Sequence, residues 1–141
     1  MKFLLAAALC IAAVGSVQAQ TNGDEDSPKV SKTTLARKES DGTITEDPET
    51  FRPKDVPIIC YVDLTVDHPV EVRLVSVAKR AVGLRPESRI ATVTYKTKQG
   101  ESGVTFTSRP KGLWAAGSYR ADVFLNGTLS DSKDFTVVSR E

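Results

Sequence analysis

Apolar and polar positions alternate with a period of two through most of the chain after residue 57, which is typical of half-buried β-strands. Together with a weaker segment nearer the N-terminus, the pattern predicts strands at 32–37, 58–64, 70–75, 90–97, 103–107, 118–125 and 134–138. No window shows the period of a helix. Short strands separated by turns at intervals of ~8–12 residues are typical of a sandwich. We therefore predict an all-β fold, a single antiparallel β-sandwich of about seven strands.

One turn carries a specific signal. Asn126 and Gly127 follow the predicted strand 118–125 and predict a hairpin turn of type I′, which needs positive φ at both central positions. With Thr128 the same residues match an N-glycosylation sequon. The turn accounts for both residues, so the match is interpreted as coincidental.

The N-terminus has the features of a secretory signal peptide. Lys2 is followed by an apolar stretch at residues 3–14 and by the small-x-small sequence of residues 17–19. The stretch is shorter than the ~20 residues that a membrane span needs. We predict cleavage after Ala19, a secreted or periplasmic protein and no membrane span. Residues 20–29, which include Asp24–Asp26, are predicted to be a disordered acidic leader, and 30–141 the one domain.

Composition argues against several function classes. The formal net charge is +1, from 19 Lys and Arg against 18 Asp and Glu, whereas nucleic-acid binders usually have a marked basic excess. His68 is the one histidine, and cleavage after Ala19 leaves Cys60 as the one cysteine, so conventional metal sites and His-based triads cannot be assembled. The acidic residues fall at predicted turns, outward strand positions or tails. We therefore predict no metal, no cofactor, no nucleic-acid partner and no enzymatic activity.

The stretch around Trp114, Gly117, Tyr119 and Val123 has the pattern W-x-x-G-x-Y-x-x-x-V. It resembles the entry to the penultimate strand in bacterial extracellular immunoglobulin-like and fibronectin-type-III-like modules. The resemblance is specific over residues 113–138 and extends only as a pattern over 57–107. It implies an immunoglobulin-like sandwich in which Tyr119 is a tyrosine corner, with its hydroxyl bonded to the chain just upstream. It implies a binding or spacing role and carries no catalytic residues.

Cys60 lies on the inward face of its strand by alternation. In antibody-type domains this position pairs with a cysteine two residues after the corner tyrosine, and here Ala121 stands there, so that disulfide is absent. A lone thiol in a secreted protein is either reactive, including toward another chain, or a small apolar core residue. The neighbours Ile58 and Val62 on the same face favour the core.

Alternate loops of such a sandwich gather at the same end, and one end collects eight cations. They are Arg52, Lys54, Lys79, Arg80, Arg85, Arg89, Arg109 and Lys111. Six of them, Lys79, Arg80, Arg85, Arg89, Arg109 and Lys111, together with Trp114 form the candidate binding site for an anionic ligand. In the alternative interpretation the cations only solvate this end and Trp114 caps the core beside Tyr119. In a third, Asp24–Asp26 fold back and mask the cations.

These features predict a non-catalytic binding or interaction module, expected to be a monomer. Its partner would be a protein with an acidic surface or an anionic polysaccharide or other envelope polymer. The alternative is an envelope structural accessory or assembly factor that acts by pairing at a sheet edge. Edge pairing predicts self-association or a stable complex, whereas a binding module keeps its activity at one end of the sandwich.

Overall fold

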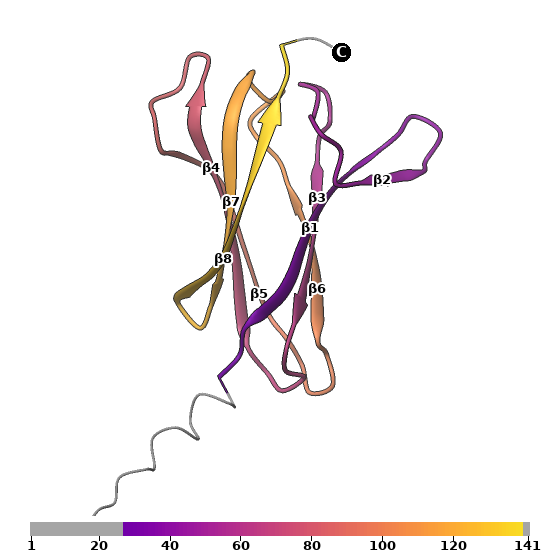
Figure 1. Cartoon of the computed structure of the whole chain (residues 1–141), viewed down its shortest axis with the longest axis vertical. Coiled ribbons are helices and arrows are strands. Elements are labelled where there is room, and N and C mark those ends of the chain that lie inside the picture. The colour runs from indigo at the N-terminus through magenta and orange to yellow at the C-terminus, as the bar shows by residue number, and fades with distance from the viewer. Residues whose placement is uncertain (1–26, 140–141) are drawn as a thin grey trace, which may run out of the picture.

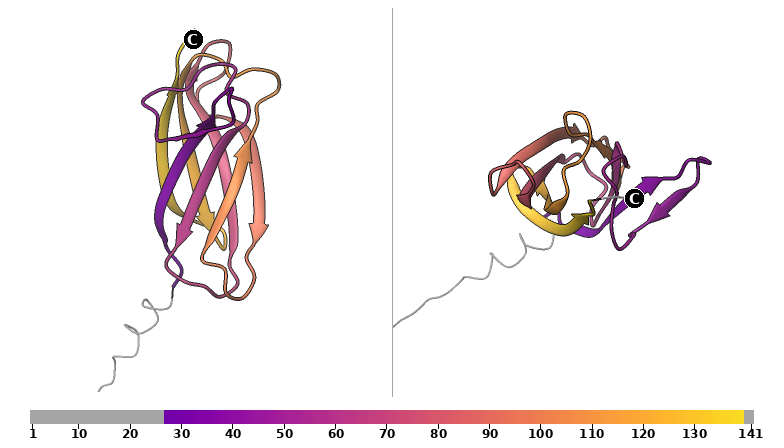
Figure 2. Two further views of the ribbon diagram at one scale, coloured as in Figure 1. Left: turned by 90° about the vertical axis from the view of Figure 1, so that its right-hand side faces the viewer. Right: turned by 90° about the horizontal axis from the view of Figure 1, so that it is seen from above.

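The computed structural model describes residues 27–139, which form eight β-strands and no helix (Figure 1). One sheet has the order β2-β1-β3-β6 and the other β5-β4-β7-β8, and every strand pair is antiparallel. The two sheets pack face to face, so the all-β sandwich is confirmed (Figure 2). The strands are β1 Val30–Lys38, β2 Ile44–Glu46, β3 Ile58–Leu64, β4 Glu71–Ala81, β5 Ser88–Lys96, β6 Gly103–Ser108, β7 Gly117–Leu125 and β8 Thr128–Val137.

All seven predicted strands are present, and the differences from prediction have local causes. β4 continues six residues beyond its predicted end because bulges at Ser76/Val77 and Ala78/Arg80 interrupt the period-two pattern there. The short strand β2 is an addition, formed where the chain turns back on β1. The predicted signal peptide, residues 1–19, and positions 20–26 of the predicted leader lie outside the described residues.

The hairpin turn is confirmed. Asn126 has φ 50° and Gly127 has φ 88°, and Leu125 pairs with Thr128 directly across the two-residue loop. β8 therefore starts at Thr128, whereas alternation placed its start at residue 134. Residues 128–133 have one large apolar side chain, Leu129, and it is 53% exposed, so no buried face marks this half of the strand.

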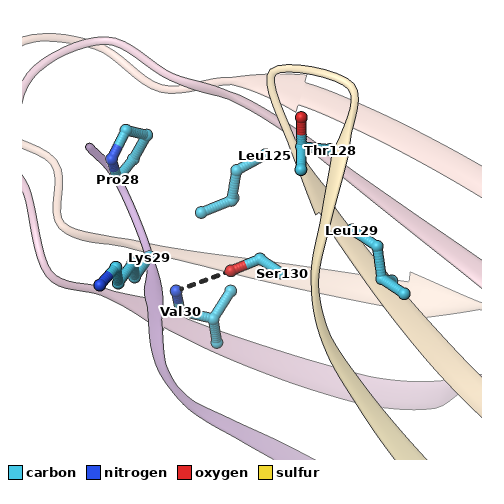
Figure 3. A pocket seen from close by; sticks show the side chains of 7 residues that line it. All are labelled: Pro28, Lys29, Val30, Leu125, Thr128, Leu129 and Ser130. Carbon is cyan, nitrogen blue, oxygen red and sulfur yellow. Dashed lines mark hydrogen bonds between the residues drawn. The ribbon is translucent and has the colours of Figure 1, made fainter. Parts of the chain in front are cut away.

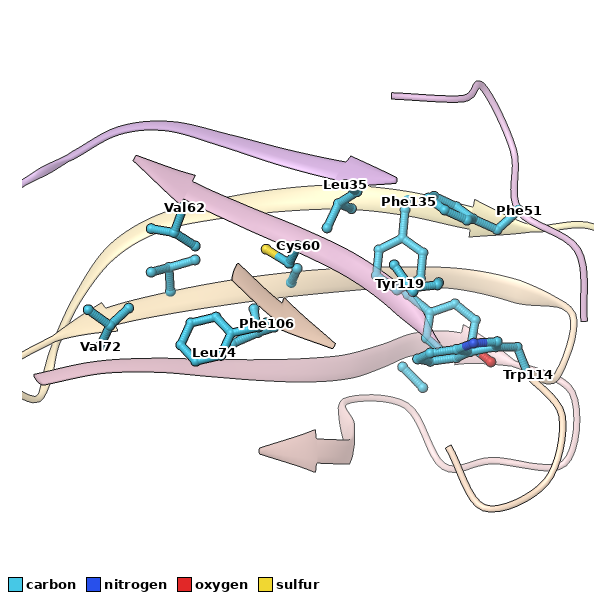
Figure 4. Close-up of a cluster of buried hydrophobic side chains, with 14 of the residues drawn as sticks. Leu35, Phe51, Cys60, Val62, Val72, Leu74, Phe106, Trp114, Tyr119 and Phe135 are labelled. Atoms are coloured by element: carbon cyan, nitrogen blue, oxygen red, sulfur yellow. The ribbon is translucent and has the colours of Figure 1, made fainter. Parts of the chain in front are cut away.

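The inward faces of the two sheets form one core (Figure 4). Cys60 lies in it with no exposed surface. Aromatic rings gather toward one end of the core. Tyr119 stacks on Phe135 at 5.1 Å between ring centroids, and Phe51 and Trp114 meet Phe135 edge-on at 5.6 and 5.9 Å. The Tyr119 hydroxyl donates a hydrogen bond to the Ala115 carbonyl, the upstream contact that the resemblance implied.

Polar contacts join the two sheets where β1 and β8 run side by side. The Thr33 hydroxyl donates to the Asp131 carboxylate at 2.6 Å, and Lys133 Nζ donates to the Thr33 carbonyl at 3.1 Å. β1 starts at one end of the sandwich and β8 finishes at the other (Figure 1). The contact joins the first residues of β1, at Val30 and Thr33, to the first half of β8, at residues 130–133.

The loops divide between the two ends as the strand order requires. Segments 39–57, 82–87 and 109–116 gather at the end where β8 finishes, which we call the cationic pole (Figure 1). Segments 65–70, 97–102 and 126–127 lie at the opposite pole. Within residues 27–139 there is no helix with the length and apolar character of a membrane span.

Candidate functional site at the cationic pole

Backbone and indole hydrogen bonds fix the three loops of the cationic pole to one another. The Val82 amide donates to the Ala116 carbonyl at 2.9 Å, which joins loop 82–87 to loop 109–116. The Trp114 amide donates to the Pro53 carbonyl at 3.0 Å, and its indole Nε1 donates to the Asp55 carbonyl at 2.8 Å. Loop 109–116 is thus tied to both of its neighbours.

Trp114 is a core residue and not part of the exposed surface. Its side chain is 2% exposed and meets the Tyr119 ring edge-on, with centroids 5.4 Å apart (Figure 4). Burial of the indole is favourable here, because its apolar rings leave water and its N–H group keeps a hydrogen-bond partner, the Asp55 carbonyl. The expectation that Trp114 contacts a ligand is therefore corrected, and the capping position beside Tyr119 is the one observed.

Five cations of the predicted set stand exposed around these loops. None of them forms an ion pair with another residue in the described range 27–139. Three come from β4, the following loop and the start of β5, and two from loop 109–116. We call them the five exposed cations: Arg80, Arg85, Arg89, Arg109 and Lys111.

Two other cations of this end are held by carboxylates. Lys79 Nζ lies 3.3 Å from the Asp134 carboxylate. Lys79 belongs to the predicted binding site, but unlike the five exposed cations it forms an ion pair. Arg52 is bonded through its guanidinium to the buried Asp55 carboxylate at 2.9 Å, which raises the pKa of Arg52. The Asp55 carboxylate also accepts a hydrogen bond from the Arg52 backbone amide at 2.7 Å, so this pair stabilises the turn at residues 52–55.

The acidic residues near this end lie on a separate projection. The hairpin formed by residues 39–49, which we call the acidic wing, extends away from the sandwich (Figure 2). Hydrogen bonds from the Thr45 hydroxyl and Arg37 lower the pKa of Glu39 to about 2, and Asp47 pairs with Lys133 at 3.1 Å. The cationic pole therefore has a positive side over loops 82–87 and 109–116 and a negative side on the wing.

A groove of about 320 Å³ runs between the two cationic loops. Its walls combine cations with apolar side chains, two of which are large and exposed, Leu84 at 38% and Leu113 at 64%. Sequence reasoning missed these two, since a single apolar residue in a loop gives no signal of facing inward or outward. The groove is lined by Leu84, Arg89, Ile90, Pro110, Lys111, Leu113, Ala115 and Tyr119.

The opposite pole has a hollow of about 370 Å³ with a different character (Figure 3). Lys29 is the one charged residue among those that line it, and the Val30 amide donates across it to the Ser130 hydroxyl at 3.1 Å. His68 also lies at this pole and is exposed. No cluster of three or more His, Cys, Asp or Glu side chains suited to a metal ion occurs within residues 27–139.

Cys60 is expected to resist thiol reagents in the native protein. Burial raises the pKa of its thiol to about 12, so at neutral pH the sulfur is protonated as well as inaccessible. In the chain from Gln20, a colorimetric disulfide reagent should label no thiol in native protein and one thiol in denaturant. Rapid labelling of native protein would show that the thiol is available for chemistry.

Comparison with known proteins assigns no family to this chain. No protein-family model and no curated protein matches it. Among solved structures it is similar to a chain from the crystal structure of a Bifidobacterium adolescentis GH3 beta-glucosidase, at 16% identity and a TM-score of 0.45. The match covers 79% of this chain and 17% of that chain. A similarity this low, to so small a part of the enzyme, carries no statement about activity here.

Proposed function

We propose that this protein is a non-catalytic binding module, secreted or periplasmic, that recognises an anionic ligand through the five exposed cations. One observation carries the proposal. Two of the five exposed cations, Arg89 and Lys111, line a groove between two loops that are hydrogen-bonded together, and the other three are exposed at the same end of the sandwich. These hydrogen bonds fix the backbones of the two loops before a ligand arrives, which lowers the entropic cost of ordering the loops on binding.

The charge distribution supports attraction at one end alone. With a net charge of +1 the whole chain has little long-range pull on a polyanion. Arg89 and Lys111 line one groove, so a ligand bound there would interact with both charges, and salt would weaken that attraction by screening. Anionic polysaccharides, other envelope polymers and acidic protein surfaces all present the complementary charge.

The sheet edges give less support to the alternative of edge pairing. At the β8 edge, Phe51 forms backbone hydrogen bonds with Thr136 and Val138, and Thr33 of β1 is bonded to Asp131 and Lys133 side chains. On the other side, β5 and β6 together line a surface hollow, so these two edges face each other across the sandwich. We therefore favour a binding site at the cationic pole over edge pairing, for which the three-residue edge strand β2 is short.

Retention on heparin resin at low salt tests the proposal. We expect the chain from Gln20 to be retained and the double variant Arg80→Glu/Arg85→Glu to elute in the low-salt wash. The matched control, Lys29→Glu/Lys98→Glu, makes the same change of net charge at the opposite pole and should be retained like the unmodified chain. Retention that survives the Arg80 and Arg85 reversal, or that fails equally in the control, contradicts a site at the cationic pole.

A further inference from the structure

Large exposed aliphatic side chains are concentrated among the five exposed cations. Of the five such residues in the described range, Val82, Leu84 and Leu113 stand on the two loops that form the groove. Val82 is 74% exposed and Leu113 is 64% exposed, the two highest values of the group. Exposed apolar residues are ordinary when scattered singly, but here three of them share one end of the sandwich with the five exposed cations.

The turns explain why these side chains face outward. Val82 precedes Gly83, with φ 78°, and Leu113 follows Gly112, with φ 81°. Each glycine takes the left-handed conformation that a tight turn needs, and no other atom lies within 4 Å of where its Cβ would stand. The two turns are therefore open to solvent, and loop 82–87 presents Val82 and Leu84 there while loop 109–116 presents Leu113.

The groove joins the two turns into one surface. Leu84 from one loop and Leu113 from the other line it, and Arg89 and Lys111 stand in the same walls. The hydrogen bond from the Val82 backbone amide to the Ala116 carbonyl holds the two loops together. Exposed aliphatic side chains next to cations match the layered chemistry of an anionic lipid bilayer, in which phosphate groups overlie hydrocarbon.

We propose that the cationic pole docks on the surface of an anionic lipid bilayer, with Val82 and Leu113 inserted at the level of the acyl chains. The inference rests on the proposed function and names its partner. A soluble polyanion would engage the cations and leave both aliphatic tips in water, whereas a bilayer accommodates both. The acidic wing does not oppose this docking, because it projects to the side and two of its carboxylates are already paired with Arg37, Arg52 and Lys133 (Figure 2).

Cosedimentation with two kinds of vesicle tests the inference, using the chain from Gln20, which keeps every described residue. One set contains equal parts of phosphatidylcholine and phosphatidylglycerol, and the other contains phosphatidylcholine alone. We expect binding to the anionic set at low salt and little binding to the neutral set. Arg80→Gln/Arg85→Gln should lower the partition coefficient about 30-fold, at the usual worth of a cation near an anionic bilayer.

The variant Val82→Ser/Leu113→Ser separates this inference from the proposed function, because it leaves every charge in place. It should lower the partition coefficient at least about tenfold while retention on heparin stays unchanged. Both residues are exposed, so the fold should tolerate the change, and an unaltered circular dichroism melting curve confirms that it does. Vesicle binding that is unaffected by the two serines, equal on neutral vesicles, or absent while heparin binding persists overturns docking on a bilayer. Absence of binding to both heparin and anionic vesicles overturns the proposed function as well.

Discussion

Gly117→Ala is expected to lower the free energy of unfolding by about 3 kcal/mol. Gly117 has φ 150°, and a Cβ at this position would lie 2.3 Å from the Arg80 carbonyl oxygen and 2.5 Å from the Ala81 Cα. Both are backbone atoms of β4, which pairs with β7 through Ala81 and Gly117. Relief therefore requires the strands to separate, since no flexible side chain is available to move. Urea denaturation followed by circular dichroism measures the loss.

Gly100→Ala is the matched control for this effect. Gly100 also has a positive φ, of 93°, but a Cβ there would meet no other atom within 4 Å. This variant carries backbone strain without the clash, so its expected loss is about 1 kcal/mol. Equal losses in the two variants would show that the approach of β7 to β4 at Gly117 is not as close as described.

Trp114→Ala is expected to cost about 4 kcal/mol, the usual range for removing a buried aromatic ring. The change empties the space beside Tyr119 and Phe135 and removes the indole donor to the Asp55 carbonyl. Trp114 is the one tryptophan of the chain, so the alanine variant has no tryptophan fluorescence. Unfolding of the unmodified protein and of the variant therefore has to be followed by circular dichroism. Trp114→Phe keeps most of the ring packing and loses the donor, so it should fall between the unmodified protein and the alanine variant. A loss below about 1 kcal/mol for the alanine variant would contradict the anchoring of loop 109–116.

The framework of the fold could be predicted wherever burial follows a period of two. Alternation predicts that Cys60 lies on the inward face of its strand, and Cys60 is buried. The hairpin at Asn126 and Gly127 could be predicted because it rests on a local φ requirement. The end of β4 could not be predicted, because bulges shift its register. The first half of β8 could not be predicted either, because it is specified by pairing with β7 and not by its own apolar pattern.

For the candidate site, the loops that meet could be predicted from strand order, but the state of their side chains could not. Lys79 and Arg109 look alike in sequence, yet Lys79 has Asp134 within 3.3 Å and Arg109 has no ion-pair partner in the described range. Trp114 and Leu113 are neighbours in one loop, and one is buried while the other is 64% exposed. Such differences depend on contacts between distant segments, which a single sequence does not display.

The placement of the start of β1 and the end of β8 at opposite ends of the sandwich has a mechanical consequence. β1 starts at one end of the sandwich and β8 finishes at the other, so tension applied between these two strand ends acts along the strand direction (Figure 1). The hydrogen bonds of the β1–β3 and β7–β8 ladders lie across that direction and are loaded together in shear. Peeling would break them one at a time, whereas shear requires many to break at once. Tension between these two strand ends therefore has to break many hydrogen bonds at once before the sandwich can extend.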